Sequence, residues 1–266
     1  MTENGLGKRK LKITDDAVGE IIRRYTTEAG VRNLERSIAA ICRSVATDIA
    51  KGNKRSATVS KAQLHKILGP IKYDSELAMR TAVPGVATGL AYTPFGGEIL
   101  FVESASMPGK GQLILTGQIG EVMKESAQAA FSIVKENSKK YGINPTRFSK
   151  QDYHIHVPAG AVPKDGPSAG TAMFVSIVSL LTNTPAKPDI AMTGEITLKG
   201  YVLPIGGLKE KILAAKQAGI KTVILPFRNK KDMVEVPAEA KKEMKFVFVK
   251  KVDEVLKYAL QEQVKH

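Results

Sequence analysis

Cysteine is almost absent from this 266-residue chain, and long apolar runs are absent altogether. The single Cys42 excludes an internal disulfide, and because it recurs with the apolar positions of a predicted helix, we expect it to be a core thiol. No stretch approaches the roughly 18 apolar residues of a membrane span. The opening residues, MTENGLGKRKLKI, contain no apolar signal core. These absences predict a cytoplasmic protein with no membrane span.

A phosphate-binding loop of the form G-x-x-x-x-G-K-[ST] is also missing. The pairs Gly7-Lys8 and Gly109-Lys110 are followed by arginine and glycine, so neither lysine precedes the hydroxyl that such a loop needs. The chain therefore cannot hydrolyse a nucleotide by that device alone.

Positive charge is in excess, with 40 Lys and Arg against 26 Asp and Glu and a formal net charge of +14. Residues 1–73 carry 15 basic and 7 acidic side chains, so the excess is concentrated in the smaller N-terminal part. This balance permits contact with nucleic acid or another polyanion. Solvated lysines on helix faces explain it equally well, and the chain shows neither interleaved aromatic residues nor a DNA-binding motif.

Apolar spacing predicts a small helical domain over residues 1–73. The clearest helix repeats apolar residues every three or four positions from Val31 to Ile49, and another follows Thr14 with acidic residues in its first turn. A short extended piece precedes a third helix, which Ser60 caps. Residues 74–86 show no sustained periodicity and are interpreted as a linker.

Residues 87–266 alternate between strand and helix patterns. An amphipathic helix is predicted near 120–140, an apolar helix after Pro167, another helix from Leu208, and a closing helix near the C-terminus. The absence of regular βα repetition favours an α+β fold over a doubly wound parallel sheet. The strand-like segments are VATGLAYT, GEILFVESAS, QLILTG, YHIHVP, DIAMTG, YVLPIG, KTVILP and KFVFV.

The stretch VPKDGPSAGTAMF, residues 162–174, sets a polar turn directly in front of an almost wholly apolar helix. Asp165 or Gly166 can cap that helix, Pro167 suits its first position, and Ser168 follows in the first turn. The helix is apolar nearly all round, so we expect it to be buried. The Ser168 hydroxyl then either supports the first turn or acts as a nucleophile.

A serine hydroxyl becomes a nucleophile only when a base removes its proton. His154 and His156 alternate on one predicted strand, but no third His or Cys lies nearby, so we expect structural hydrogen bonds rather than a metal site. The arrangement S-x-x-K is excluded, because Thr171 stands where Ser168 would require the lysine.

Lys211 is the lysine that looks arranged to act as a base. Lys209 and Lys216 fall on one stripe of the predicted helix, whereas Lys211 points elsewhere, among small residues that include Ala214 and Ala215. Burial and the field of the helix N-terminus both lower the pKa of an amine in this position. The alternative is a structural lysine that extends its amine to solvent.

Three segments together resemble a known family. HIHVPAGAVPKDGPSAG (154–170) and MTGEITLKGYVLPIGGLKEKILAA (192–215) resemble the proteolytic domain of Lon, the ATP-dependent serine protease. YTTEAGVRNLER (25–36) resembles the small helical lid of the Lon AAA+ ATPase module. The resemblance runs over essentially the whole chain. It implies an α+β proteolytic domain of the Lon type, preceded by a small all-α AAA+ lid.

The resemblance implies a Ser–Lys dyad, with Ser168 as the nucleophile and Lys211 as the general base and acid. It also implies a serine endopeptidase that cleaves unfolded or damaged proteins and peptides inside the chamber of a homohexameric ring. We further expect Thr193 to hold the Lys211 amine, the alternative being a turn residue before Gly194. Asp165 and Gly166 are expected to order the loop or shape an oxyanion site.

ATP and Mg belong, on this resemblance, to the full-length protein. Arg32 resembles the lid arginine that reads bound ATP in the intact ATPase. Because the large ATPase subdomain is missing, we expect a fragment that uses no cofactor or metal and cleaves only peptides or unfolded chains, without ATP. The alternative is a basic module that binds nucleic acid or assembles rings without catalysis.

Overall fold

The computed structural model divides the chain into two compact units, Met1–Ser75 and Glu76–His266. The part of the predicted linker that spans residues 74–82 lies outside the described residues. The predicted boundaries at 73 and 87 stay predictions. The structure describes residue 6 and residues 11–26, 28, 30–53, 56–72, 83–93, 96–158 and 164–261.

The first unit is helical, as predicted, with one addition. The Thr14 hydroxyl accepts a hydrogen bond from the Ala17 N–H at 3.3 Å and so caps α1, and Ser60 forms a capping box at the start of α3. Cys42 is 1% exposed in the apolar core, which confirms the core thiol. The addition is a parallel pair of short strands. The elements are β1 (Leu11–Ile13), α1 (Asp15–Arg24), α2 (Arg32–Ala50), β2 (Ala57–Val59) and α3 (Lys61–Leu68).

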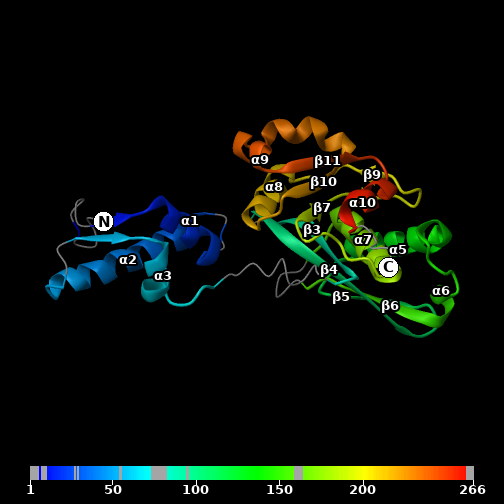
Figure 1. The fold of residues 1–266 in the computed structure, drawn as a ribbon, viewed down its shortest axis with the longest axis horizontal. Coiled ribbons are helices and arrows are strands. Elements are labelled where there is room, and N and C mark those ends of the chain that lie inside the picture. Colours follow the sequence, from blue (N-terminus) through cyan, green and yellow to red (C-terminus); the bar gives the residue numbers. More distant parts are fainter. Residues whose placement is uncertain are drawn as a thin grey trace. The chain divides into compact units, whose positions relative to one another are not determined.

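The second unit is built on a seven-stranded mixed sheet in the order β11-β10-β7-β3-β4-β6-β5 (Figure 1). β3 pairs antiparallel with β4 and β4 with β6, whereas the remaining neighbours are parallel. A mixed sheet of this kind confirms the α+β fold. Its strands are β3 (Val86–Thr93), β4 (Gly96–Pro108), β5 (Leu113–Thr116), β6 (Gln151–His156), β7 (Ile190–Met192), β10 (Thr222–Pro226) and β11 (Lys245–Val249); β8 (Glu195–Ile196) and β9 (Val202–Leu203) form a separate hairpin.

Helices cover both faces of this sheet (Figure 1). α5, α7 and α10 pack on one face, and α8 and α9 pack on the other. The helices are α5 (Glu121–Glu136), α6 (Arg147–Lys150), α7 (Gly170–Thr182), α8 (Leu208–Gln217), α9 (Ala238–Glu243) and α10 (Val252–Ala259), with 3₁₀ turns η2 (Ser138–Tyr141), η3 (Pro167–Ala169) and η4 (Phe227–Glu235).

The central strands are buried on both sides, which is why their sequences read as nearly continuous apolar runs. On β3, Leu90 packs with the α8 side and Ala91 with the α7 side. Every residue of α7 except Leu180 and Thr182 is buried, as the apolar pattern predicted. α7, which follows the turn of Ser168, and α8, which carries Lys211, therefore pack on opposite faces of one sheet. None of the helices in the described part of the chain combines the length and apolar character that a membrane crossing requires.

Candidate active site

Ser168 lies in the 3₁₀ turn η3, directly before α7. Gly166 is the residue that caps this turn, and its φ of 128° is a backbone conformation that favours glycine. Pro167 occupies the first helical position. The predicted helix start is confirmed, with the difference that its first turn is 3₁₀ rather than α. The turn brings the Ser168 hydroxyl to the edge of a pocket.

Lys211 lies in the first turn of α8 and is 2% exposed. Burial lowers the pKa of its amine from the ordinary 10.5 to about 8. Lys209 on the same helix is exposed, and the Lys216 amine lies 3.1 Å from the Glu243 carboxylate. The inference that Lys211 faces the interior is therefore confirmed, and the alternative of an amine extended to solvent is wrong.

Thr193, which follows β7, links Lys211 to Ser168 through two hydrogen bonds. Its hydroxyl accepts a hydrogen bond from the Lys211 amine at 3.3 Å and donates one to the Ser168 carbonyl oxygen at 3.2 Å. The same carbonyl accepts a hydrogen bond from the Gly194 N–H at 2.9 Å. Thr193 is 1% exposed, so solvent does not compete for these bonds. The expected contact between Thr193 and the Lys211 amine is present.

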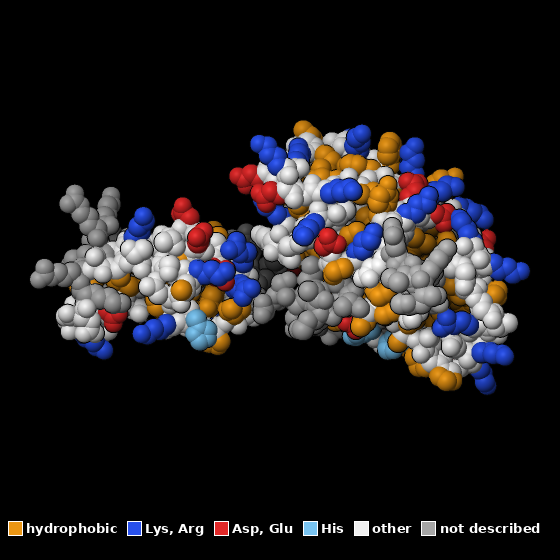
Figure 2. Space-filling model, viewed as in Figure 1, with side chains coloured by type: hydrophobic (Ala, Val, Ile, Leu, Met, Phe, Trp, Pro, Cys, Tyr) orange, Lys and Arg blue, Asp and Glu red, His pale blue; other side chains and the backbone are white. Residues whose placement is uncertain are grey.

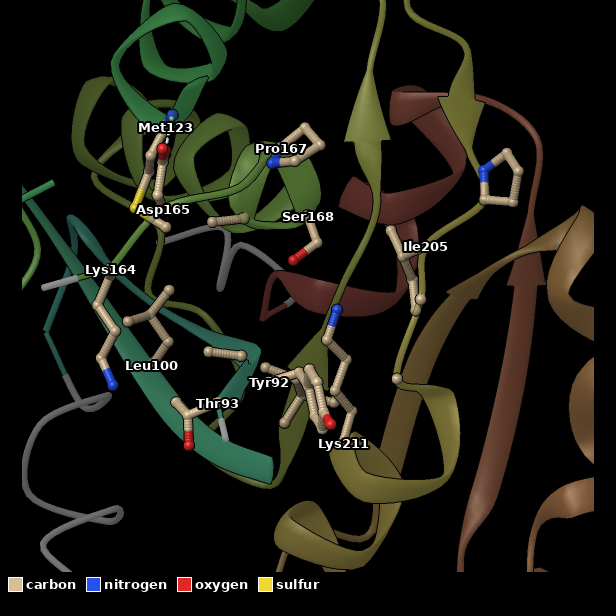
Figure 3. A pocket seen from close by; sticks show the side chains of 16 residues that line it. Tyr92, Thr93, Leu100, Met123, Lys164, Asp165, Pro167, Ser168, Ile205 and Lys211 are labelled. Carbon is tan, nitrogen blue, oxygen red and sulfur yellow. Dashed lines mark hydrogen bonds between the residues drawn. The ribbon is translucent and has the colours of Figure 1, made fainter. Parts of the chain in front are cut away.

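The Ser168 hydroxyl and the Lys211 amine point toward one another across a pocket of about 530 Å³ (Figure 3). The serine approaches from η3 and the lysine from α8. The pocket walls are largely apolar and include Tyr92, Leu100 and Ile205. A large apolar pocket with a few convergent polar groups is the usual form of a substrate site.

Asp165 does not cap the helix of Ser168. Its carboxylate accepts a hydrogen bond at 3.0 Å from the N–H of Met123, the third residue of α5, and another at 2.9 Å from the Gly166 N–H. Of the two candidate caps, Gly166 is the one that caps the turn of Ser168, whereas the Asp165 carboxylate caps a neighbouring helix. The carboxylate ties the serine loop to the N-terminus of α5, where the helix dipole favours a negative charge.

His154 and His156 both contact the Thr116 hydroxyl, at 2.8 and 2.6 Å. This confirms the expected structural hydrogen bonds. Among the residues that the structure describes, no group of three or more His, Cys, Asp or Glu side chains is arranged to hold a metal ion. Arg32 is exposed at the start of α2 and belongs to the first unit.

On the face drawn in Figure 2, lysines and arginines are interspersed with acidic and hydrophobic side chains. This distribution is that of solvated surface charge.

An ion pair at the pocket was not predicted from the sequence. The Lys164 amine, in a side chain that is 8% exposed, contacts the Glu98 carboxylate on β4, and Lys164 lines the pocket. The two residues are 66 positions apart, and no local pattern relates them.

An α+β domain whose pocket joins a serine hydroxyl to a desolvated amine has the layout of a serine hydrolase that uses lysine as its base. The family model of the Lon protease (S16) C-terminal proteolytic domain matches residues 58–262. The model of the Lon protease AAA+ ATPase lid domain matches residues 2–58. The chain belongs to the Lon protease (S16) family, and the resemblance stated from its sequence is confirmed. Its matched proteolytic domain is a serine-type peptidase domain.

Relatives of the chain carry the same family name. Lon protease from Syntrophus aciditrophicus (strain SB) is 56% identical over 257 residues, which cover 97% of this chain and 32% of the relative. Lon proteases from Methylocella silvestris and Anaeromyxobacter dehalogenans are 53% and 54% identical, and cover 97% and 98% of this chain and 32% and 31% of their own length. The chain thus spans about a third of the length of the curated relatives it matches.

Proposed function

We propose that the chain is a serine endopeptidase in which Ser168 is the nucleophile and Lys211 is the general base. One observation carries the proposal: the two side chains face each other in one pocket, and burial brings the pKa of the Lys211 amine to about 8. With that pKa, the Lys211 amine is neutral in about a tenth of the molecules at pH 7. For an ordinary lysine the neutral fraction is about three in ten thousand. Only the neutral amine can accept a proton from serine.

In the proposed reaction, the Lys211 amine takes the proton of the Ser168 hydroxyl as the serine oxygen attacks a peptide carbonyl carbon. The oxyanion that forms needs fixed donors. The Gly166 N–H is already bonded to the Asp165 carboxylate, so we assign this role to the Ser168 N–H, which has no acceptor within its own helix turn. The charged Lys211 amine then protonates the leaving nitrogen as the C–N bond breaks. Water hydrolyses the acyl-enzyme, with Lys211 again as the base.

Thr193 and Asp165 support this reaction without touching the scissile bond. The Thr193 hydroxyl fixes the direction of the Lys211 amine relative to the serine segment. The Asp165 carboxylate holds the loop before Ser168 against α5. A hydrogen bond that orients a catalytic base preserves the geometry on which the proton transfer depends.

The proposed substrates are peptides and unfolded protein chains, cleaved without ATP by this chain alone. ATP with Mg would act in the full-length protein, where Arg32 of the matched lid would sense the nucleotide. We also propose that the full-length protein is a cytoplasmic homohexamer with the pockets facing an internal chamber. Addition of ATP to a casein digest by this chain tests the first point, because the rate should not change.

The dyad is tested by casein hydrolysis and by mass spectrometry after treatment with a serine-directed acylating inhibitor. Ser168→Ala and Lys211→Gln should each abolish hydrolysis and labelling while the circular dichroism spectrum stays unchanged. Lys209→Gln is the matched control, because it removes an exposed lysine from the same helix turn. Substantial activity in Lys211→Gln would show that another group is the base.

A further inference from the structure

Two adjacent residues at the start of β4 contact the elements that carry Ser168 and Lys211. Gly97 lies against the backbone of α8. A Cβ built at Gly97 would stand 2.1 Å from the Glu210 carbonyl oxygen and 2.9 Å from the Lys211 backbone nitrogen. Any side chain at this position would push α8 away from the sheet. Gly97 therefore sets how closely the first turn of α8 approaches β4.

Glu98, the next residue along β4, holds the other element. Its carboxylate is paired with the Lys164 amine, four positions before Ser168. The Lys164 side chain is 8% exposed and the Glu98 side chain 34% exposed. Because the Lys164 side chain is buried, loss of the Glu98 carboxylate would leave its charge largely uncompensated, so the pair constrains the loop. β4 thus restrains the serine loop through a charge and the lysine helix through close packing.

The backbone of Lys164 is fixed as well. Its N–H donates to the Gln118 carbonyl oxygen at 3.2 Å, and its carbonyl oxygen accepts from the Gly120 N–H at 2.8 Å. These bonds lock the loop against the segment before α5, which leaves the Glu98 contact to set its distance from β4. Glu98 in turn is paired in register with Ala91 of β3, in the interior of the sheet.

We propose that Gly97, Glu98 and Lys164 are positioning residues that hold Ser168 and Lys211 at their working separation. The inference rests on the proposed function. Within the described part of the chain, no hydrogen bond joins the Ser168 hydroxyl to the Lys211 amine, whose bond goes to Thr193. The scaffold, rather than a direct bond, therefore fixes their spacing. A misplacement of about 1 Å in a catalytic pair lowers a rate by about a hundredfold.

The test compares steady-state hydrolysis of a fluorogenic peptide, with the 266-residue chain, in Glu98→Gln, Lys164→Met, Lys164→Arg and Gly97→Ala. Loss of the pair should lower kcat by at least about tenfold and leave KM within about twofold, because the apolar binding walls remain. Lys164→Arg, which keeps the charge, should recover most of kcat. Gly97→Ala should also shift the midpoint of the pH–rate profile, because it changes how closely the backbone packs around Lys211. The matched control is Lys124→Met, which breaks a more exposed pair with Glu121 on α5.

A kcat for Glu98→Gln and Lys164→Met equal to that of the unaltered chain would overturn the inference. So would equal losses in Lys164→Met and Lys164→Arg. If Lys164→Met does not fold, Glu98→Gln decides, because it replaces a partly exposed carboxylate with a group of the same shape. Failure of the proposed function looks different: Ser168→Ala would then keep the activity of the unaltered chain. The positioning role alone would be rejected if the unaltered protein is active, Ser168→Ala is inactive, and the positioning variants are fully active. The proposed function would then still hold.

Discussion

Replacing Lys211 by methionine should make the protein more stable and inactive at the same time. Burial shifts the pKa of the Lys211 amine from 10.5 to about 8. Each unit of such a shift corresponds to about 1.4 kcal/mol, so a charged Lys211 destabilises the native state by about 3 kcal/mol at pH 7. Methionine fills a similar space without a charge. We therefore expect Lys211→Met to raise the free energy of unfolding at pH 7 by about 3 kcal/mol.

The stability difference between Lys211→Met and the unaltered protein should depend on pH. Between pH 8 and pH 10.5 the unfolded chain keeps the Lys211 proton and the native state has lost it, so the stability of the unaltered protein rises with pH in this window. The stability gap between variant and unaltered protein should therefore shrink to about 1 kcal/mol at pH 9.5. Urea unfolding at the two pH values, followed by tyrosine fluorescence, measures the gap. The transition of the first unit serves as an internal reference, because the substitution lies in the second.

Two results would contradict this prediction. A Lys211→Met protein no more stable than the unaltered one at pH 7 would mean that the buried amine carries no desolvation penalty. A gap that stays constant from pH 7 to 9.5 would mean that the gain comes from packing alone. Lys209→Met is the control: the side chain is exposed on the same helix turn and should change stability little at either pH.

Three further predictions follow from the same geometry. The kcat/KM for a peptide should rise about tenfold from pH 7 to a plateau above the Lys211 pKa of about 8; a profile flat from about pH 6 to 9.5 contradicts lysine as base. Gly166→Ala should lower stability in thermal unfolding by about 1–2 kcal/mol, because its φ is 128° although a Cβ there meets no atom within 4 Å; unchanged melting would reject the strain. Asp165→Ala should remove about 1 kcal/mol through loss of the α5 cap, and an unaltered melt would reject that cap.

The parts of the site that local sequence patterns encode were predicted. The consecutive residues from Asp165 to Ser168 predict the turn before α7. The burial of Lys211 follows from helical spacing alone. The pairing of Ser168 with Lys211 came from the resemblance to a family, and the contact between Thr193 and Lys211 was expected from the hydroxyl of Thr193 alone. These features need only a few neighbouring residues to be read.

The rest depends on which strands become neighbours, and single-sequence patterns carry little of that information. The pairing of β3 with both β4 and β7 places β4 beside the pocket, and only this brings Glu98 to Lys164. Local spacing offers Asp165 or Gly166 as the cap of the turn before α7. It cannot locate the N-terminus of α5, 42 positions away, which the Asp165 carboxylate caps instead. Side-chain contacts across such separations become visible only when the register of the sheet is fixed.

The burial that suits Lys211 for catalysis also opposes folding. Removing its amine from water lowers the pKa, so that part of the amine is neutral near neutral pH and can accept a proton, and this removal destabilises the native state. A flexible helix would relieve the penalty by letting the amine reach solvent, as lysine side chains ordinarily do. The contact of α8 with Gly97 and the hydrogen bond that the Lys211 amine donates to the Thr193 hydroxyl block that relief. Rigidity around α8 is therefore a condition for an active base, and substitutions that loosen this packing should lose activity before they lose the fold.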